Sequence, residues 1–183
     1  MMEPSKFVKM VIAALCLALA YVLPFLTGQI PEIGAMLCPM HIPVLLCGFL
    51  SGSGWGVVVG LVAPLFRSFT LSMPPLFPTA ICMGLELGTY GLVAGFMHRI
   101  LPRKKTYIYL SLITAMLTGR AVWGISTLLC LGLSGGQFTF SAFIVGAFTN
   151  AIPGIILQIL LIPFLMFFLE TLKLSSVFKE KDK

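Results

Sequence analysis

The chain has 183 residues, of which 58% are hydrophobic and 10% are charged, whereas about 25% of the residues in an ordinary soluble domain are charged. This composition excludes a soluble globular domain and a disordered chain. It indicates a multi-pass membrane protein that forms a single domain over residues 1–183. The net charge of +6 does not indicate a nucleic-acid partner, because most Lys and Arg residues lie in short patches between or outside the apolar segments.

Six apolar segments predict membrane-spanning helices, since a span needs about 20 mostly apolar residues. In chain order they cover residues 7–26, 39–51, 54–71, 78–98, 107–133 and 141–171. The second segment is short for a span, so we expect it to be tilted or to pair tightly with the third through the glycine-containing connection at 51–54. The predicted fold class is therefore an all-α membrane protein with six transmembrane helices.

The basic residues predict how the chain is oriented. They form three patches, which are Lys6 and Lys9; Arg99, Arg103, Lys104 and Lys105; and Lys173, Lys179, Lys181 and Lys183. Lys and Arg mark the cytoplasmic side of membrane proteins. We therefore expect the N-terminus, the connection between the fourth and fifth helices and the C-terminal tail at about 173–183 to be cytoplasmic. Six spans place all three on one side, and the loops at 27–38, 72–77 and 134–140, which lack Lys and Arg, on the other.

Small residues recur at intervals of four. The glycines with this spacing are Gly48, Gly52, Gly56 and Gly60; Gly84 and Gly88; and Gly91 and Gly95. Small residues four apart allow membrane helices to approach closely, so we expect tight helix packing around them. Ala14 and Ala18 give the first helix the same spacing. Prolines lie in and beside the loops at 27–38 and 72–77, and they are Pro24, Pro31, Pro39, Pro43, Pro74, Pro75 and Pro78. We expect both loops to be shaped caps, because proline stiffens a loop.

Charged and polar residues inside the apolar segments are the candidates for function, since a charge at the bilayer centre costs about 2.5–3.5 kcal/mol. At a rise of 1.5 Å per residue, Glu86 lies about 12 Å, Asn150 about 14 Å and Arg120 about 20 Å from the outer end of its helix. Arg67 and His41 lie nearer the outer ends of theirs. Five helices thus place a polar group between the outer surface and the midplane. The pattern predicts a polar cavity that opens to the outside.

Each of these residues also has a structural interpretation. Arg67 would extend its charge to the outer head groups. Glu86 and Arg120 would form a salt bridge between helices, with or without lining a site. Asn150 would bridge two helices by a hydrogen bond, and His41 would lie at the interface.

Two aromatic residues accompany the charged pair. Tyr90 lies one turn from Glu86, and Trp123 lies one turn from Arg120. Both would stack on a ligand if the cavity exists, and both would otherwise belong to the core of the bundle. Gln158 lies deeper than the other polar candidates.

The residue types indicate the ligand that such a cavity would take. Two arginines suit a carboxylate or a phosphate, because the guanidinium group presents paired donors. Glu86 suits an amine, a hydroxyl or an amide. A small, water-soluble, anionic or zwitterionic metabolite fits this set.

Sequence motifs for catalysis are lacking. The chain has no phosphate-binding loop of the type G-x-x-x-x-G-K-[ST], no H-E-x-x-H motif and no serine paired with a histidine as in rhomboid-type sites. Its five cysteines show no metal-ligand spacing, and we interpret them as small packing residues. We therefore expect neither an enzyme nor a bound metal or cofactor.

The chain resembles the substrate-binding S component of an energy-coupling factor (ECF) vitamin transporter. The resemblance covers nearly the whole chain, in its size, six helices, cytoplasmic ends and outer loops over a polar cavity. It is most evident in four stretches, residues 41–50 (HIPVLLCGFL), 64–68 (PLFRS), 73–80 (MPPLFPTA) and 86–95 (ELGTYGLVAG). These are similar to sequence blocks of the pantothenate, riboflavin and pyridoxine branch.

The resemblance implies a mechanism and partners. In S components, a small-x-x-x-small motif on the first helix docks onto the membrane-embedded T component, and Ala14 and Ala18 fit that pattern. The family implies a substrate site formed by the first outer loop, the loop after the third helix and helices four to six, where Glu86, Arg120 and Asn150 lie. It further implies that two cytoplasmic ATPases, acting through the T component, make the S component topple in a bacterial cell membrane and release its vitamin inside.

Two other functions remain open on the sequence. The first is a structural membrane scaffold of the MreD type, which has a similar size and helix count but needs no buried charges converging from several helices. The second is a stand-alone secondary transporter, for which Glu86 would be the coupling residue. High-affinity binding of a small metabolite would separate the S component from a scaffold. Uptake without an ATPase partner would indicate the secondary transporter.

Overall fold

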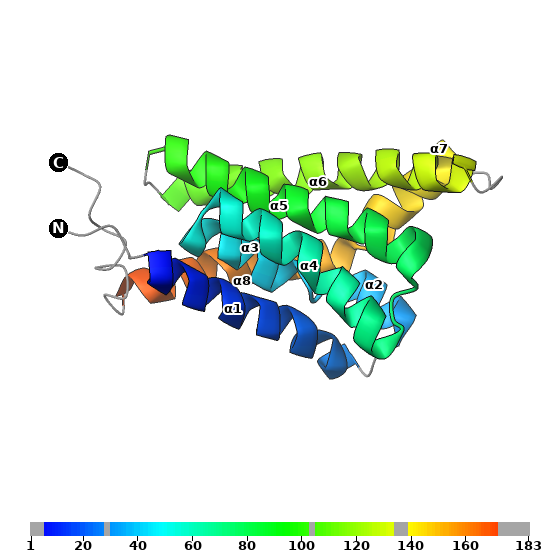
Figure 1. The fold of residues 1–183 in the computed structure, drawn as a ribbon. Helices are drawn as coiled ribbons and strands as arrows, with labels where there is room; N and C mark the ends of the chain where they lie inside the picture. The colour runs from blue at the N-terminus through cyan, green and yellow to red at the C-terminus, as the bar shows by residue number, and fades with distance from the viewer. Residues whose placement is uncertain (1–5, 28–29, 103–104, 134–138, 172–183) are drawn as a thin grey trace.

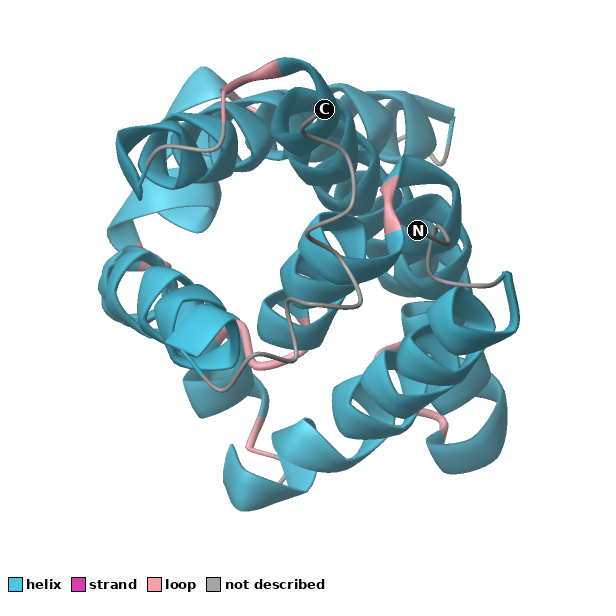
Figure 2. Cartoon of the chain, turned by 90° about the vertical axis from the view of Figure 1, so that its left-hand side faces the viewer, coloured by secondary structure: helices cyan, strands magenta, loops and turns pink. Residues whose placement is uncertain are grey.

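The computed structural model describes residues 6–27, 30–102, 105–133 and 139–171, and within these ranges it contains helices and no strand. The protein is an all-α membrane protein whose long helices lie side by side (Figures 1 and 2). The helices are α1 (Lys6–Val22), α2 (Pro31–Leu37), α3 (His41–Ser51), α4 (Ser53–Leu71), α5 (Ile81–Ile100), α6 (Lys105–Leu133), α7 (Phe140–Ile144) and α8 (Ile152–Thr171). Three short helical turns, Leu23–Thr27, Leu76–Ala80 and Val145–Thr149, adjoin α1, α5 and α7.

Five helical stretches are long and apolar enough to cross a membrane. They are Lys6–Leu26, Ser53–Leu71, Leu76–Ile100, Lys105–Gly132 and Ile152–Leu169, and they correspond to the first, third, fourth, fifth and sixth predicted helices. The remaining predicted helix is α3, whose 11 residues extend about 16 Å against a hydrocarbon core of about 30 Å. The count of six spans therefore stays a prediction.

The start of α1, the end of α8 and the connection from α5 to α6 lie at the same end of the bundle (Figure 1). Lys6 opens α1, Arg99 lies in the last turn of α5 and Lys105 opens α6, so these basic residues share that end. α2 and α7 lie at the opposite end (Figure 1). This arrangement agrees with the predicted grouping of basic patches, while the side of the membrane that this end faces stays a prediction. The basic tail at about 173–183 lies outside the described residues.

Two predicted boundaries are wrong. The single helix expected over 141–171 is broken, because α7 and the turn at Val145–Thr149 precede a turn at 150–151 and α8 starts only at Ile152. Pro153 explains the break, since it has no N–H to donate to the carbonyl of residue 149 and its ring would clash with that carbonyl in a continuous helix. The segment expected as the loop 27–38 contains α2. Most of the loop expected at 134–140 lies outside the described residues.

Helix α5 is the centre of the bundle and packs against α3, α4 and α6. Glycine allows this approach, because a Cβ atom added at Gly60 would lie 2.5 Å from the backbone of Leu87, and one added at Gly91 would collide with the backbone of Gly56. The predicted close packing is thus confirmed for the α4–α5 interface. Gly52 is the exception, since nothing lies within 4 Å of its Cβ position and its φ of +93° serves the turn between α3 and α4 instead.

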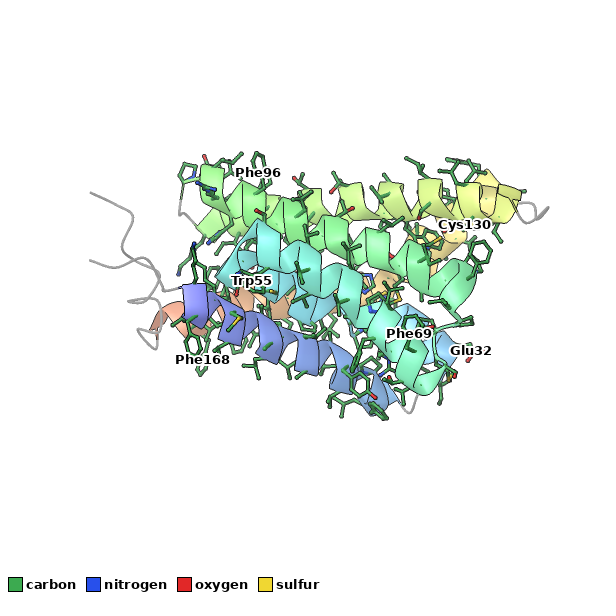
Figure 3. The ribbon with its side chains drawn as sticks, in the orientation of Figure 1. Glu32, Trp55, Phe69, Phe96, Cys130 and Phe168 are labelled. Atoms are coloured by element: carbon green, nitrogen blue, oxygen red, sulfur yellow. The ribbon has the colours of Figure 1, made fainter. Side chains whose placement is uncertain are left out.

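The outer surface of the bundle is apolar. Phe69 of α4, Phe96 of α5 and Phe168 of α8 point away from the neighbouring helices (Figure 3), and each exposes more than half of its surface. The interior contains fully buried apolar side chains such as Leu45 and Leu87. Exposed phenylalanines would be unfavourable in water but match the hydrocarbon of a bilayer, which is consistent with a membrane protein.

Candidate functional site

A buried polar cluster joins three helices in the interior of the bundle. We define it by five residues, which are Cys38, His41, Glu86, Tyr90 and Arg120. Oε1 of Glu86 lies 2.9 Å from Nη1 of Arg120 and 3.4 Å from Nε2 of His41. Arg120 Nη2 donates a hydrogen bond of 3.4 Å to Sγ of Cys38. The rings of His41 and Tyr90 lie 5.1 Å apart, centre to centre.

The local structure explains why these side chains meet. Glu86 and Tyr90 are one helical turn apart on α5, so both face the same neighbours. His41 is the first residue of α3. Cys38 ends α2 in a left-handed conformation with φ of +47°, which turns the chain into α3 and brings the thiol to the arginine. On α6, a Cβ at Gly119 would collide with the Tyr90 ring, so the missing side chain makes room for Tyr90 beside Arg120.

Burial of the charges explains their pairing. Glu86 is 2% exposed and Arg120 is 6% exposed, and an isolated charge costs several kcal/mol in such surroundings even after relaxation. Mutual attraction offsets that cost at a distance of 2.9 Å. The predicted salt bridge between Glu86 and Arg120 is therefore confirmed. Whether the pair also contacts a ligand stays a prediction.

Several polar atoms of the cluster retain hydrogen-bonding capacity. Within the part of the chain that the structure describes, His41 Nδ1 and Arg120 Nε are buried and have no hydrogen-bond partner. Native proteins satisfy most buried polar groups. These atoms are therefore the ones that a small polar molecule would satisfy.

Arg67 has other partners. Its Nη1 donates a hydrogen bond of 2.7 Å to the carbonyl oxygen of Tyr21 at the end of α1, and its guanidinium lies over the rings of Tyr21 and Phe25. Pro24, three residues after Tyr21, has no N–H to offer that carbonyl. Arg67 is buried and connects α4 to the C-terminal end of α1, where a cation is favourable.

Trp123 and Asn150 lie in different surroundings. Trp123 stacks on Phe143 of α7, with ring centres 6.3 Å apart, and a Cβ at Gly146 would lie 2.8 Å from its ring. Asn150 is exposed in the turn before α8, and its backbone N–H donates to the carbonyl of Val145. The structure therefore brings four predicted site residues together and assigns Arg67, Trp123 and Asn150 to other contacts.

Two buried polar residues, Cys38 and Gln158, were not predicted as site residues, although Gln158 was named as a deeper polar candidate. Cys38 was expected only to pack, yet it accepts the hydrogen bond from Arg120. Burial raises the pKa of the Cys38 thiol, so the thiol stays neutral at pH 7. Gln158 of α8 is fully buried, and both atoms of its amide have no hydrogen-bond partner among the described residues. Gln158 is the one amide side chain between Ile152 and Leu169. This isolated polar residue in an apolar segment is the sequence feature that indicates a buried polar group.

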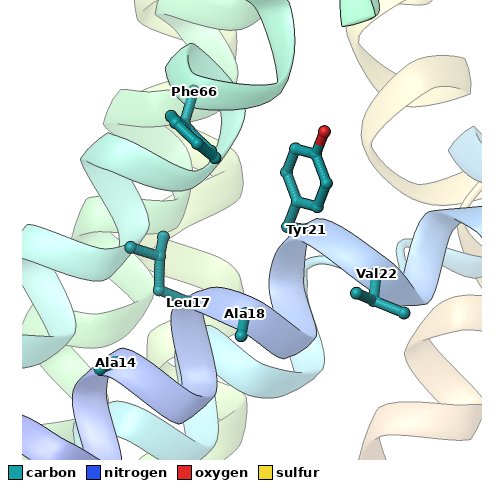
Figure 4. A pocket seen from close by; sticks show the side chains of 6 residues that line it. All are labelled: Ala14, Leu17, Ala18, Tyr21, Val22 and Phe66. Carbon is teal, nitrogen blue, oxygen red and sulfur yellow. The ribbon is translucent and has the colours of Figure 1, made fainter. Parts of the chain in front are cut away.

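An apolar groove runs along the outer face of α1 (Figure 4). It has a volume of about 340 Å³ and is lined by Ala14, Leu17, Ala18, Tyr21, Val22 and Phe66. Ala14 and Ala18 are exposed, and the small side chains leave the backbone of α1 accessible to a neighbouring helix. The two alanines predicted to bind a partner thus lie on a free face of the described structure.

The described residues offer no group of three or more His, Cys, Asp or Glu side chains that could hold a metal ion. The polar cluster consists of the ion pair between Glu86 and Arg120 and the side chains around it. Its chemistry is hydrogen bonding and charge pairing in an apolar interior.

The fold and the cluster define a class, a multi-pass helical membrane protein with a buried polar cluster between its helices. Comparison with known families gives the more specific result. Residues 8–166 match the model of the family described as ECF transporter, substrate-specific component. The chain belongs to this family, which confirms the resemblance found in the sequence. The family is one of transport proteins and implies a small-molecule substrate and partnership with T and ATPase components. No curated protein and no solved structure matches the chain.

Proposed function

We propose that this protein binds a small water-soluble vitamin or a related metabolite from outside a bacterial cell and takes part in its ATP-driven uptake. The candidates are pantothenate, riboflavin and a pyridoxine-like vitamer. Membership of the family of substrate-specific components supports the role. The single observation that supports a binding site is the buried cluster, which combines a charge pair with hydrogen-bonding atoms that have no partner among the described residues.

The proposed binding residues are His41, Glu86, Tyr90 and Arg120. They come from α3, α5 and α6, so a ligand between them contacts three helices at once. A site of this kind couples ligand binding to the relative position of the helices, because the ligand satisfies polar atoms on each of them. Trp123 of α6, one turn from Arg120, lies on the α7 side of this site.

Partner binding uses the groove on α1. A T component would place an apolar helix against Ala14 and Ala18, whose small side chains permit close contact. Its two ATPase subunits would then drive the protein to topple and release the ligand inside. The three outer loops at 27–38, 72–77 and 134–140 contain no Lys or Arg, which lowers the cost of moving them through the bilayer.

Native mass spectrometry of the detergent-purified protein tests the proposal. We expect a co-purified small molecule whose mass matches a vitamin and which is released when the protein is unfolded. The matched control is the Ala14→Trp variant, which should retain the same mass because Ala14 lies outside the cluster. Protein that is free of any small molecule, and that binds none of the three candidate vitamins when they are added, would favour a scaffold instead. Uptake that persists without an ATPase partner would favour a secondary transporter.

A further inference from the structure

The charges of the buried polar cluster bear on the kind of ligand that fits there. The sequence offered Arg67 and Arg120 as two cations for an anionic ligand. In the structure, both guanidinium groups already have partners. Arg120 faces the Glu86 carboxylate at 2.9 Å and Cys38 at 3.4 Å, and Arg67 donates to the Tyr21 carbonyl at 2.7 Å.

The formal charges of Glu86 and Arg120 cancel. Glu86 contributes one negative charge and Arg120 one positive charge. Burial raises the pKa of Cys38, so its thiol adds no charge at pH 7. His41 directs Nε2 at the same Glu86 oxygen, 3.4 Å away, so a proton on that nitrogen is directed at Glu86 and not at a ligand. A carboxylate or phosphate placed here would meet the Glu86 carboxylate without an unpaired cation to balance it.

The atoms without partners are of mixed type. Arg120 Nε can only donate a hydrogen bond, whereas His41 Nδ1 is an acceptor when the proton of the neutral ring is on Nε2, which faces Glu86. A carboxylate or phosphate oxygen only accepts hydrogen bonds, so it cannot satisfy an acceptor. An uncharged group such as an amide, a hydroxyl or a ring with N–H and C=O groups both donates and accepts. It matches the set without adding a buried charge.

We infer that the buried polar cluster selects an uncharged ligand that carries both hydrogen-bond donors and acceptors, and that it discriminates against the anionic form of the same molecule through Glu86. The inference rests on the proposed function, since it concerns the same site. Among the candidate vitamins it favours riboflavin and pyridoxine over pantothenate.

Matched ligand pairs test the inference on the full chain purified in detergent. The pairs are pantothenol and pantothenate, riboflavin and riboflavin 5′-phosphate, and pyridoxine and pyridoxine 5′-phosphate. Affinity is measured at pH 7.5 by titration calorimetry and by the rise in the unfolding temperature. We expect an uncharged member to bind, and its anionic partner to bind at least about tenfold more weakly.

The outcomes separate the inference from the proposed function. An anionic member that binds as tightly as its uncharged partner, or more tightly, overturns the inference and leaves the proposed function intact. Failure of all six compounds to bind overturns the proposed binding of these vitamins and the inference with it.

A charge-neutral variant then tests the role of Glu86. In Glu86→Gln the Arg120 charge loses its partner, so the preference for the uncharged member should fall by about tenfold or more. The control is Glu32→Gln, which removes an exposed carboxylate of α2 (Figure 3) that is not part of the polar cluster. Its preference should equal that of the wild type. If folded Glu86→Gln still prefers the uncharged member as strongly as the wild type does, the inference is overturned. The anionic member is then excluded by its size and not by the Glu86 carboxylate. If this variant does not fold, the pantothenol and pantothenate pair on the wild type decides the question, because its two members are of nearly equal size.

Discussion

Glu86 of α5 and Arg120 of α6 form an ion pair of 2.9 Å in the interior of the bundle, with His41 of α3 at 3.4 Å from the same carboxylate oxygen. One oxygen atom therefore connects three helices. Because α5 also packs against α4, the carboxylate of Glu86 lies near the structural centre of the protein. The following predictions test its role and that of the residues around it.

The first prediction concerns the stability of the ion pair. Arg120→Met should lower the free energy of unfolding by about 3–5 kcal/mol, because it leaves the Glu86 carboxylate buried and uncompensated. The double variant Glu86→Gln/Arg120→Met should lose clearly less, since no charge remains. Unfolding of both variants in detergent, followed by circular dichroism, gives the comparison. Equal losses in the two variants would show that the pair is not energetically coupled.

The second prediction concerns binding. Arg120→Ala should weaken the binding of the ligand found by native mass spectrometry by about tenfold or more, because a hydrogen bond to a charged group contributes about 1.5–3 kcal/mol. Titration calorimetry on the folded variant measures the change. Arg120→Lys, which keeps the charge and loses the planar guanidinium, should fall between the wild type and Arg120→Ala. Unchanged affinity in folded Arg120→Ala would remove this residue from the site.

The third prediction concerns the contact between α4 and α5. Gly91→Ala places a methyl group against the backbone of Gly56, and such overpacking costs about 1–3 kcal/mol. Gly54→Ala is the matched control, since nothing lies within 4 Å of its Cβ position, and alanine is the better helix former. Thermal unfolding should show a lower midpoint for Gly91→Ala and no loss for Gly54→Ala. A tolerated Gly91→Ala would contradict the close packing of these helices.

The fourth prediction concerns Arg67. Arg67→Met removes the hydrogen bond to the Tyr21 carbonyl and should destabilise the protein by about 1.5–3 kcal/mol. The control is Phe69→Ala on the same helix, whose side chain is 74% exposed and should matter less. Limited proteolysis should cut the connection after α1 faster in Arg67→Met than in Phe69→Ala. Similar rates for the two variants would argue against a tether between α1 and α4.

The fifth prediction concerns partner docking. Ala14→Trp fills the groove on α1 and should abolish co-purification with the T component while ligand binding is retained. Ile125→Trp is the control and should co-purify normally. Ile125 is 60% exposed and belongs to α6, which lies across the bundle from α1 (Figure 1). Assembly that survives Ala14→Trp would place the docking surface elsewhere.

Much of the fold follows from local features of the chain. The apolar segments and their lengths determined the class of helical membrane protein and the approximate position of each long helix. Gly56, Gly60 and Gly91 indicated tight packing, because small residues four apart let a neighbouring helix approach closely. The pairing of Glu86 with Arg120 was also predicted, because two opposite charges in neighbouring apolar helices have few alternatives to each other.

Other features depend on contacts between residues far apart in the chain. Hydropathy predicted one helix over 141–171 where the structure has α7 and α8. The break at 150–151 depends on Pro153 and on the packing of α8 against α2 and α6. Hydropathy also did not determine how each helix is rotated about its axis, and that rotation decides which neighbour a side chain meets.

Arg67 and Arg120 show this difference most clearly. By sequence both are isolated cations in apolar segments, and they differ only in their expected depth, with Arg67 nearer the outer end of its helix than Arg120. The tertiary structure gives Arg67 a backbone carbonyl of α1 and gives Arg120 the carboxylate of Glu86. The sequence by itself determined that buried cations need partners, because the cost of a bare charge in an apolar interior does not depend on the fold. Only the packing of α1, α4, α5 and α6 decided which partner each cation has, and with it the charge that a ligand would meet.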